Sequence, residues 1–117
     1  MGEMVQASCE CGYESGSLPF GAGMMDFTTT CMAPALCERC RNVVPGTLFP
    51  LEAVCPDCGA AVTFYTDVTL HDGPFPSEGS YTWRLPTGVE VVLPAERCTC
   101  PVCTEKRLRF LLRALFD

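Results

Sequence analysis

The chain has 117 residues, of which 48% are hydrophobic, so it is long enough for one domain with an apolar core. Ten prolines and ten glycines are many for this length and argue against long helices. The formal charge is −6 and the pI is about 4.6. An acidic surface repels the phosphate backbones that dominate nucleic-acid affinity, so the composition disfavours nucleic-acid binding.

Ten cysteines are the outstanding feature of the composition. The first nine residues show neither the basic start nor the apolar run of a signal peptide. No stretch approaches the roughly 18 apolar residues of a membrane span. We therefore expect a cytoplasmic chain with reduced thiols and no membrane contact, in which closely paired cysteines indicate metal more often than disulfides.

The first predicted element is a metal-binding turn with the sequence Cys9-Glu-Cys11-Gly12-Tyr13. Gly12 can take a positive φ there, which lets backbone N–H groups turn towards the sulfurs. Residues 15–23 are rich in glycine and serine and predict a turn region. Residues 24–30 end in β-branched threonines and predict a strand, which Cys31 closes.

Two Cys-x-x-Cys steps occupy the middle of the chain, at residues 37–40 and 55–58, with fourteen residues between them. This spacing is typical of a zinc ribbon, in which each step aims two sulfurs at one metal ion. The intervening residues are enough for two short strands, and Pro45-Gly46 predicts the turn between them.

The second half of the chain predicts further strands. Residues 60–70 alternate apolar and polar side chains and predict a strand. Residues 80–85 and 89–93 predict a β-hairpin with a three-residue loop, and we expect the apolar core to lie there. The tail at 105–116 fits a helix or a strand equally well. The predicted fold is mostly β, small and metal-stabilised, and it forms one domain over residues 1–117. The cysteine-bearing turns, which we call knuckles, lie near residues 9–11, 37–40, 55–58 and 98–103. A β-rich insert covers residues 60–95, and the chain ends in a short helix if the tail is helical.

Four close cysteine pairs predict two Cys₄ sites and two zinc ions per chain. One alternative groups the central pairs and ties the two chain ends together; the other groups the pairs sequentially, 9/11 with 37/40 and 55/58 with 100/103. We favour the first because its central spacing is that of a ribbon. Its sites are Cys37, Cys40, Cys55 and Cys58 for the inner one, and Cys9, Cys11, Cys100 and Cys103 for the outer one. Eight thiolates and two divalent ions would change the formal charge from −6 to −10.

Cys31 and Cys98 are left over as extra thiols. A buried, small apolar role is the first interpretation, and a redox-sensitive thiol is the alternative. Cys98 also competes with Cys100 for the outer site, because Cys98 and Cys100 repeat the Cys-x-Cys step. His71 is the one histidine of the chain and is expected to be a solvated loop residue. The acidic residues show no spacing that would mark paired acid–base chemistry.

The order of the cysteine motifs resembles that of small bacterial zinc-ribbon proteins of uncharacterised function. The shared motifs are Cys9-x-Cys11-Gly-Tyr, Phe27-Thr-Thr-x-Cys31, Cys37-x-x-Cys40, Cys55-Pro-x-Cys58-Gly and Cys100-Pro-x-Cys103. The resemblance spans most of the chain and implies zinc and a ribbon fold, without an activity. The leucine-rich tail and Cys98 depart from the family pattern.

Two turns also resemble those of rubredoxin, namely Cys11-Gly-Tyr13 and Cys55-Pro-Asp-Cys58-Gly59. That resemblance implies one iron ion in a Cys₄ site and electron transfer. The first turn departs from rubredoxin because it is Cys-x-Cys rather than Cys-x-x-Cys.

The first functional expectation is a structural zinc protein without catalytic residues that serves as a protein-interaction or adaptor module, with the apolar tail at 104–117 as its interface. The alternatives are an iron electron-transfer protein and, disfavoured by charge, a nucleic-acid-binding ribbon. The sequence does not predict an oligomeric state.

Overall fold

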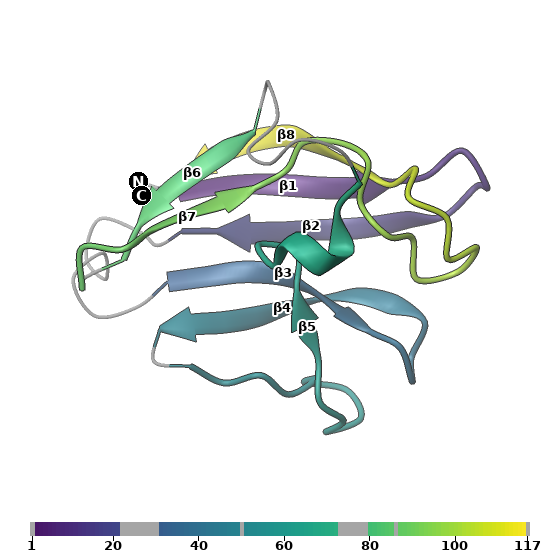
Figure 1. Cartoon of the computed structure of the whole chain (residues 1–117), viewed down its shortest axis with the longest axis horizontal. Helices are drawn as coiled ribbons and strands as arrows, with labels where there is room; N and C mark the ends of the chain where they lie inside the picture. Colours follow the sequence, from purple (N-terminus) through teal and green to yellow (C-terminus); the bar gives the residue numbers. More distant parts are fainter. Residues whose placement is uncertain (1, 22–30, 50, 73–79, 86, 117) are drawn as a thin grey trace.

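Antiparallel β-sheets make up most of the molecule (Figure 1). The computed structural model describes residues 2–21, 31–49, 51–72, 80–85 and 87–116. Two three-stranded sheets have the orders β2-β1-β8 and β4-β3-β5, and β6 and β7 form a hairpin. The elements are β1 (Gly2–Ser8), β2 (Glu14–Phe20), β3 (Cys31–Cys37), β4 (Asn42–Phe49), β5 (Thr63–Phe64), a 3₁₀ turn η1 (Val68–Leu70), β6 (Tyr81–Arg84), β7 (Glu90–Leu93) and β8 (Arg109–Phe116).

The two three-stranded sheets adjoin along β2 and β3. Gly21 and Met32 exchange two backbone hydrogen bonds there, of 2.8 and 2.9 Å. Gly21 has a φ of +99°, and the indole of Trp83 would lie 2.6 Å from a Cβ atom at this position. A glycine is therefore needed both for the backbone turn at the end of β2 and for the contact with the β6–β7 hairpin.

The prediction of a mostly β fold is confirmed, and the predicted hairpin is present. Across this hairpin Tyr81 pairs with Leu93, and Trp83 pairs with Val91. The C-terminal tail forms the strand β8, so the helical alternative for residues 105–116 is wrong. Cross-strand pairing along β1 accounts for this outcome, because it places Phe110 opposite the buried Ala7.

The sequence predicts the apolar core in the hairpin, whereas most of the core residues belong to the two three-stranded sheets and the segments next to them. Trp83 and Val91 are only partly buried, and of the paired hairpin side chains described above Leu93 alone is fully buried. The ring of Tyr65 packs edge-on against that of Phe110, with centroids 5.1 Å apart. The fully buried apolar residues around this pair include Val5, Ala7, Phe20, Ala33, Ala35, Leu93 and Leu108.

Two predicted turns are strands in the structure. Residues 15–20 belong to β2, and Pro45-Gly46 lies inside β4. Pro45 faces Pro34 of β3, and the carbonyl of Pro34 accepts a hydrogen bond from Tyr65 on the other side of the strand. The two prolines therefore stand at a position whose backbone groups point away from the β3–β4 ladder, so their missing N–H groups cost that ladder no hydrogen bond.

The strand predicted over residues 60–70 is mostly absent. After the two residues of β5, the Asp67 side chain accepts a hydrogen bond from the Thr69 backbone and begins the turn η1. Tyr65 is fully buried although the alternation predicts it to face solvent, and Val68 is 55% exposed. The apolar alternation therefore stops corresponding to burial after Phe64. The strand predicted over residues 24–30 lies outside the described residues.

Candidate metal centres

The eight paired cysteines lie in two groups of four, as the favoured alternative predicts. Within each group all four Sγ atoms lie within 4.8 Å of one another. The outer group is Cys9, Cys11, Cys100 and Cys103, and the inner group is Cys37, Cys40, Cys55 and Cys58. The sequential pairing of neighbouring knuckles is therefore wrong.

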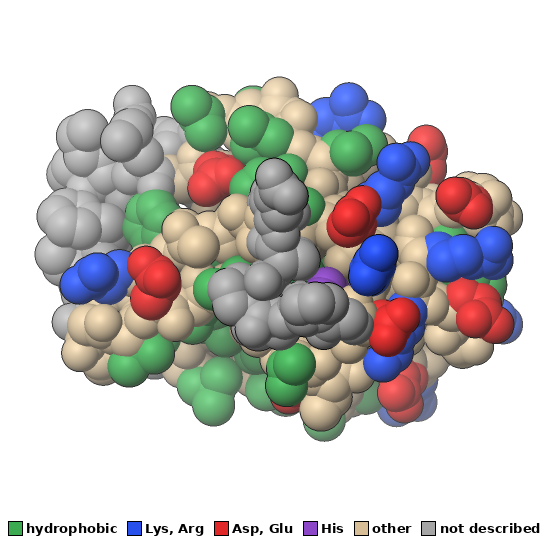
Figure 2. All heavy atoms as spheres, turned by 45° about the horizontal axis from the view of Figure 1, so that its top comes forward, with side chains coloured by type: hydrophobic (Ala, Val, Ile, Leu, Met, Phe, Trp, Pro, Cys, Tyr) green, Lys and Arg blue, Asp and Glu red, His purple; other side chains and the backbone are tan. Residues whose placement is uncertain are grey.

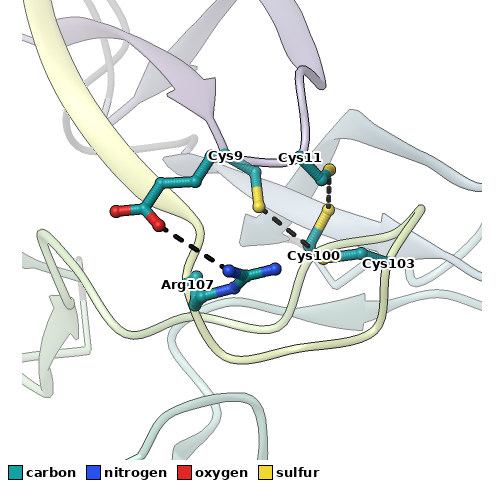
Figure 3. Close-up of polar contacts among 6 residues, drawn as sticks. Cys9, Cys11, Cys100, Cys103 and Arg107 are labelled. Carbon is teal, nitrogen blue, oxygen red and sulfur yellow. Dashed lines mark hydrogen bonds and ion pairs between the residues drawn. The ribbon is translucent and has the colours of Figure 1, made fainter.

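The sulfur–sulfur separations match the edges of a tetrahedral metal site. In the outer group, Cys9 Sγ lies 3.7 Å from Cys103 Sγ, and Cys11 Sγ lies 3.7 Å from Cys100 Sγ (Figure 3). The corresponding separations in the inner group are 3.6 and 3.8 Å. A tetrahedron with metal–sulfur bonds of about 2.3 Å has edges of about 3.8 Å, whereas a disulfide requires about 2.05 Å. The residues therefore fit a metal ion coordinated by four thiolates.

Each group is built from the same sequence of elements. The outer group joins the β1–β2 turn to the loop that leads into β8, which pairs with β1. The inner group joins the β3–β4 turn to the loop that leads into β5, which pairs with β3. Each metal would thus connect a hairpin turn to the loop before the third strand of the same sheet. The inner unit is inserted in the chain between the two halves of the outer unit.

The four knuckles also share a backbone conformation. The residue after the second cysteine of every knuckle has a positive φ: 102° at Gly12, 52° at Arg41, 74° at Gly59 and 64° at Thr104. This conformation turns the chain back so that backbone N–H groups reach the sulfurs. The two glycines indicate a positive φ in the sequence. Arg41 and Thr104 give no such indication, because a residue with a Cβ atom disfavours this conformation.

Backbone N–H groups donate to sulfurs in both groups. The N–H of Cys40 donates to Cys37 Sγ, that of Asp57 to Cys55 Sγ, and that of Val102 to Cys100 Sγ, each at 3.4 Å. A thiolate is a better acceptor than a thiol, so these bonds stabilise the ligand form of the cysteine.

The thiols of each group differ in acidity when no metal is bound. Hydrogen bonds from the backbone of Ala60 and Glu105 lower the pKa of Cys58 and of Cys103, respectively, to about 7. Burial raises the pKa of Cys9 to about 12, and a hydrogen bond with the Cys58 thiol raises that of Cys40 to about 12. Each group thus contains one thiol poised to ionise near neutral pH and at least one that requires the metal to displace its proton.

An arginine lies beside the outer group, and a hydrogen bond links the inner and outer knuckles. The Arg107 guanidinium lies beside the sulfurs in Figure 3 and forms a 3.6 Å ion pair with Glu10. Its pKa is raised by a hydrogen bond with Cys103. Arg41, from the inner knuckle, donates a 2.9 Å hydrogen bond to the carbonyl of Val102 in the outer one. A cavity of about 430 Å³ lies between the two knuckles and is lined by Leu36, Glu38, Arg41, Thr99, Cys100, Pro101 and Thr104.

Cys31 and Cys98 lie outside both groups and are fully buried. Burial raises the pKa of Cys31 to about 11 and that of Cys98 to about 12. Cys98 Sγ lies 3.6 Å from the carbonyl oxygens of Pro94 and Glu96. Cys98 therefore does not replace Cys100 as a ligand, and the environment of both thiols is that of small buried side chains.

His71 is buried, with 6% of its surface exposed, so the expectation of a solvated loop residue is wrong. Its backbone pairs with that of Cys98, which draws the residue under the loop before the outer knuckle. Burial and the positive charge of Arg97 lower the pKa of its imidazole. His71 belongs to neither cysteine group.

Comparison of the chain with protein-family models, with curated proteins and with solved structures finds no match. Across the described residues, no helix is long and apolar enough to cross a membrane.

Proposed function

We propose that this chain is a structural zinc protein without catalytic activity, in which two Zn²⁺ ions hold a β scaffold that acts as a protein-interaction module. The observation that carries the proposal is the closure of both cysteine groups, since four mutually adjacent sulfurs complete a tetrahedron. A catalytic zinc ion keeps an open coordination position, and a Cys₄ site offers none. The resemblance to bacterial zinc-ribbon proteins supports zinc as the metal.

The metals would supply much of the folding free energy. The outer group joins segments at the two ends of the chain, and the inner group joins two turns of the central segment. A structural zinc site contributes roughly 10–16 kcal/mol in small zinc-binding peptides. The loss of either ion is therefore expected to unfold the sheet that it supports.

Metal identity and stoichiometry decide the first half of the proposal. Native mass spectrometry of protein purified without added metal is expected to show two zinc ions per chain, and the solution is expected to be colourless. A red solution with thiolate-to-iron absorption would instead support rubredoxin-like electron transfer, because Cys₄ geometry accepts either ion.

The proposed interaction with another protein cannot use all of residues 104–117 as its interface. Leu108 and Phe110 are buried and β8 pairs along β1, so deletion of residues 104–117 would remove part of the core. A sharper experiment compares capture of proteins by the metal-loaded chain with capture by a Cys40→Ser, Cys58→Ser variant. Capture that needs the loaded chain supports the proposal, and equal capture by both would contradict it.

Nucleic acid remains the disfavoured partner. The formal charge of −6 becomes −10 when eight thiolates bind two divalent ions. A titration with single-stranded and double-stranded oligonucleotides at low salt is expected to show no binding, because the acidic surface repels phosphates. Binding that weakens steeply as the salt concentration rises would instead indicate phosphate contacts.

A further inference from the structure

Six of the eight exposed large apolar side chains of the described residues lie in two stretches of the chain, and Val89 and Val102 lie elsewhere. Leu51, Val54 and Val68 are 69%, 51% and 55% exposed, and they lie in the segments after β4 and in η1. Leu111, Leu112 and Leu115 of β8 are 37%, 48% and 69% exposed. Figure 1 shows β8 and the segment after β4 on opposite sides of the molecule. Figure 2 shows hydrophobic side chains near both the upper and the lower margin of the face drawn.

The two regions carry opposite charges. No lysine or arginine occurs anywhere between Asn42 and Trp83, whereas Glu52 and Asp67 lie among the exposed apolar residues of that segment. By contrast, Lys106, Arg107, Arg109 and Arg113 are four of the eight cations of the chain, and Glu3 of β1, which pairs with Leu115, is the carboxylate beside them on that sheet. We refer to Leu51, Asp67 and Val68 as the acidic patch, since Leu51 and Asp67 line one hollow whereas Glu52 and Val54 line another, and to Arg109, Leu111, Leu112, Arg113 and Leu115 as the basic patch.

The acidic patch borders a hollow. A shallow cavity of about 430 Å³ is lined by Leu48, Leu51, Ala53, Val62, Thr63, Phe64, Thr66 and Asp67. Its walls are largely apolar, and Asp67 provides a carboxylate at its rim. A side chain with an apolar stem and a cationic neighbour is the complement of such a hollow.

At the centre of the basic patch, the backbone edge of β8 is already hydrogen-bonded, so only side chains are available for contact with another chain. The N–H of Phe110 donates to the carbonyl of Ala95, and the carbonyl of Phe110 accepts from the Tyr81 hydroxyl, at 2.8 and 3.0 Å. These contacts occupy the outer edge of β8 at Phe110, so a second β8 strand cannot add there. A symmetric contact between two basic patches would also bring like charges together.

We propose that copies of this chain associate head to tail, with the basic patch of one copy seated on the acidic patch of the next. The contact would bury apolar surface from both patches and pair arginines with carboxylates. Because the two patches are different surfaces of one copy, the contact is heterologous and generates a ring or an open chain of copies. This inference goes beyond the proposed function, since it concerns contact between copies and needs no second kind of partner.

The test is sedimentation of the metal-loaded full chain at protein concentrations from micromolar to millimolar. The salt concentration is about 0.15 M, at which interactions between exposed charges more than about 8 Å apart are largely screened. The mass of the wild-type protein is expected to rise with concentration. Leu115→Glu adds a carboxylate to the basic patch, opposite that of Glu3, and Leu51→Lys places an ammonium group in the acidic patch. Each is expected to weaken association by about tenfold or more, as for a residue central to an interface. Val89→Glu, at a residue that is 57% exposed and outside both patches, is the matched control and is expected to associate like the wild type.

A mixture of the two variants distinguishes a head-to-tail contact from a symmetric one. The Leu115→Glu chain keeps an intact acidic patch, and the Leu51→Lys chain keeps an intact basic patch. An equimolar mixture is therefore expected to associate more strongly than either variant alone, because each mixed pair can form one unaltered contact. The proposal is overturned if the wild type stays a single chain at millimolar concentration, if Leu51→Lys associates as strongly as the wild type, or if the mixture associates no more strongly than either variant alone. The metal content of every variant is measured first. A variant that binds two metals per chain has intact metal centres, so a loss of association in that variant cannot result from a loss of metal.

Discussion

The ring of Phe64 lies against the backbone of Gly46, where a Cβ atom would be 2.6 Å from its Cε1 atom. Gly46 is in β4 and Phe64 is in β5, on either side of the central strand β3. The ring can cross β3 because the β3 residues paired with these two positions, Ala33 and Ala35, have small side chains. One glycine thus permits an aromatic contact that joins the two outer strands of the inner sheet.

Gly46→Ala is expected to lower the free energy of unfolding of the metal-loaded protein by about 1–3 kcal/mol, because the new methyl group overpacks a buried contact. Denaturant unfolding at equal metal content measures the change. Gly16→Ala is the matched control, since no atom lies within 4 Å of a Cβ at that position in β2. A stability of Gly46→Ala equal to that of the control would show that the ring moves aside at no cost.

The same contact shows why the sequence predicts the grouping of the cysteines better than it predicts the strands. Knuckle spacing is a local signal, and the grouping of the inner set followed from the ribbon-like distance between its two steps. The continuation of β4 through Pro45-Gly46 depends instead on Pro34 across the ladder and on the Phe64 ring, which local turn propensity does not include. The burial of His71 likewise depends on its pairing with Cys98, far along the chain.

Thr104→Gly is expected to raise the stability of the metal-loaded protein by about 0.5–1 kcal/mol. Thr104 has a φ of 64°. A left-handed conformation costs a residue with a Cβ roughly 1–2 kcal/mol, part of which is offset by the greater entropy that glycine loses on folding. Unfolding by denaturant at saturating metal measures the gain.

Gly59→Ala tests the same backbone requirement in the opposite direction. Gly59 has a φ of 74°, and no atom lies within 4 Å of a Cβ there, so any effect comes from the backbone alone. The substitution is expected to cost about 1–2 kcal/mol. If both substitutions leave stability unchanged, the positive φ is not a requirement of the knuckles.

The affinity for zinc is expected to rise with pH between about 6 and 8. The metal binds thiolates, so each thiol that is protonated in the metal-free chain must lose its proton on binding. Cys9 and Cys40, with pKa values raised to about 12, are protonated throughout this range, whereas Cys58 and Cys103, at about 7, ionise within it. Falling pH therefore weakens binding through all four of these thiols below pH 7, and mainly through Cys9 and Cys40 above it.

Competition with a chromogenic chelator at several pH values measures this slope. The slope of log affinity against pH is expected to be steeper below pH 7 than above it, because Cys58 and Cys103 add their protons there. Titration of a chelator-matched blank at each pH is the control. A pH-independent affinity would contradict binding through thiolates.

Cys98 and Cys100 stand two residues apart, and the structure gives them opposite roles. Cys100 Sγ lies in the outer group, whereas Cys98 Sγ is buried near two backbone carbonyls. Cys100→Ala is expected to leave one metal per chain, because three thiolates do not close the outer tetrahedron. Cys98→Ala removes one buried sulfur and is expected to keep two metals per chain at a cost of about 1 kcal/mol in stability.

Native mass spectrometry of the two variants gives the metal count, and denaturant unfolding gives the stability. Each variant is the control for the other, since both replace a fully buried cysteine in the same loop by alanine. The opposite pattern, with one metal in Cys98→Ala and two in Cys100→Ala, would make Cys98 the ligand. That result would also shift the outer knuckle by two residues, and the N–H of Val102 would then no longer donate to a ligand sulfur.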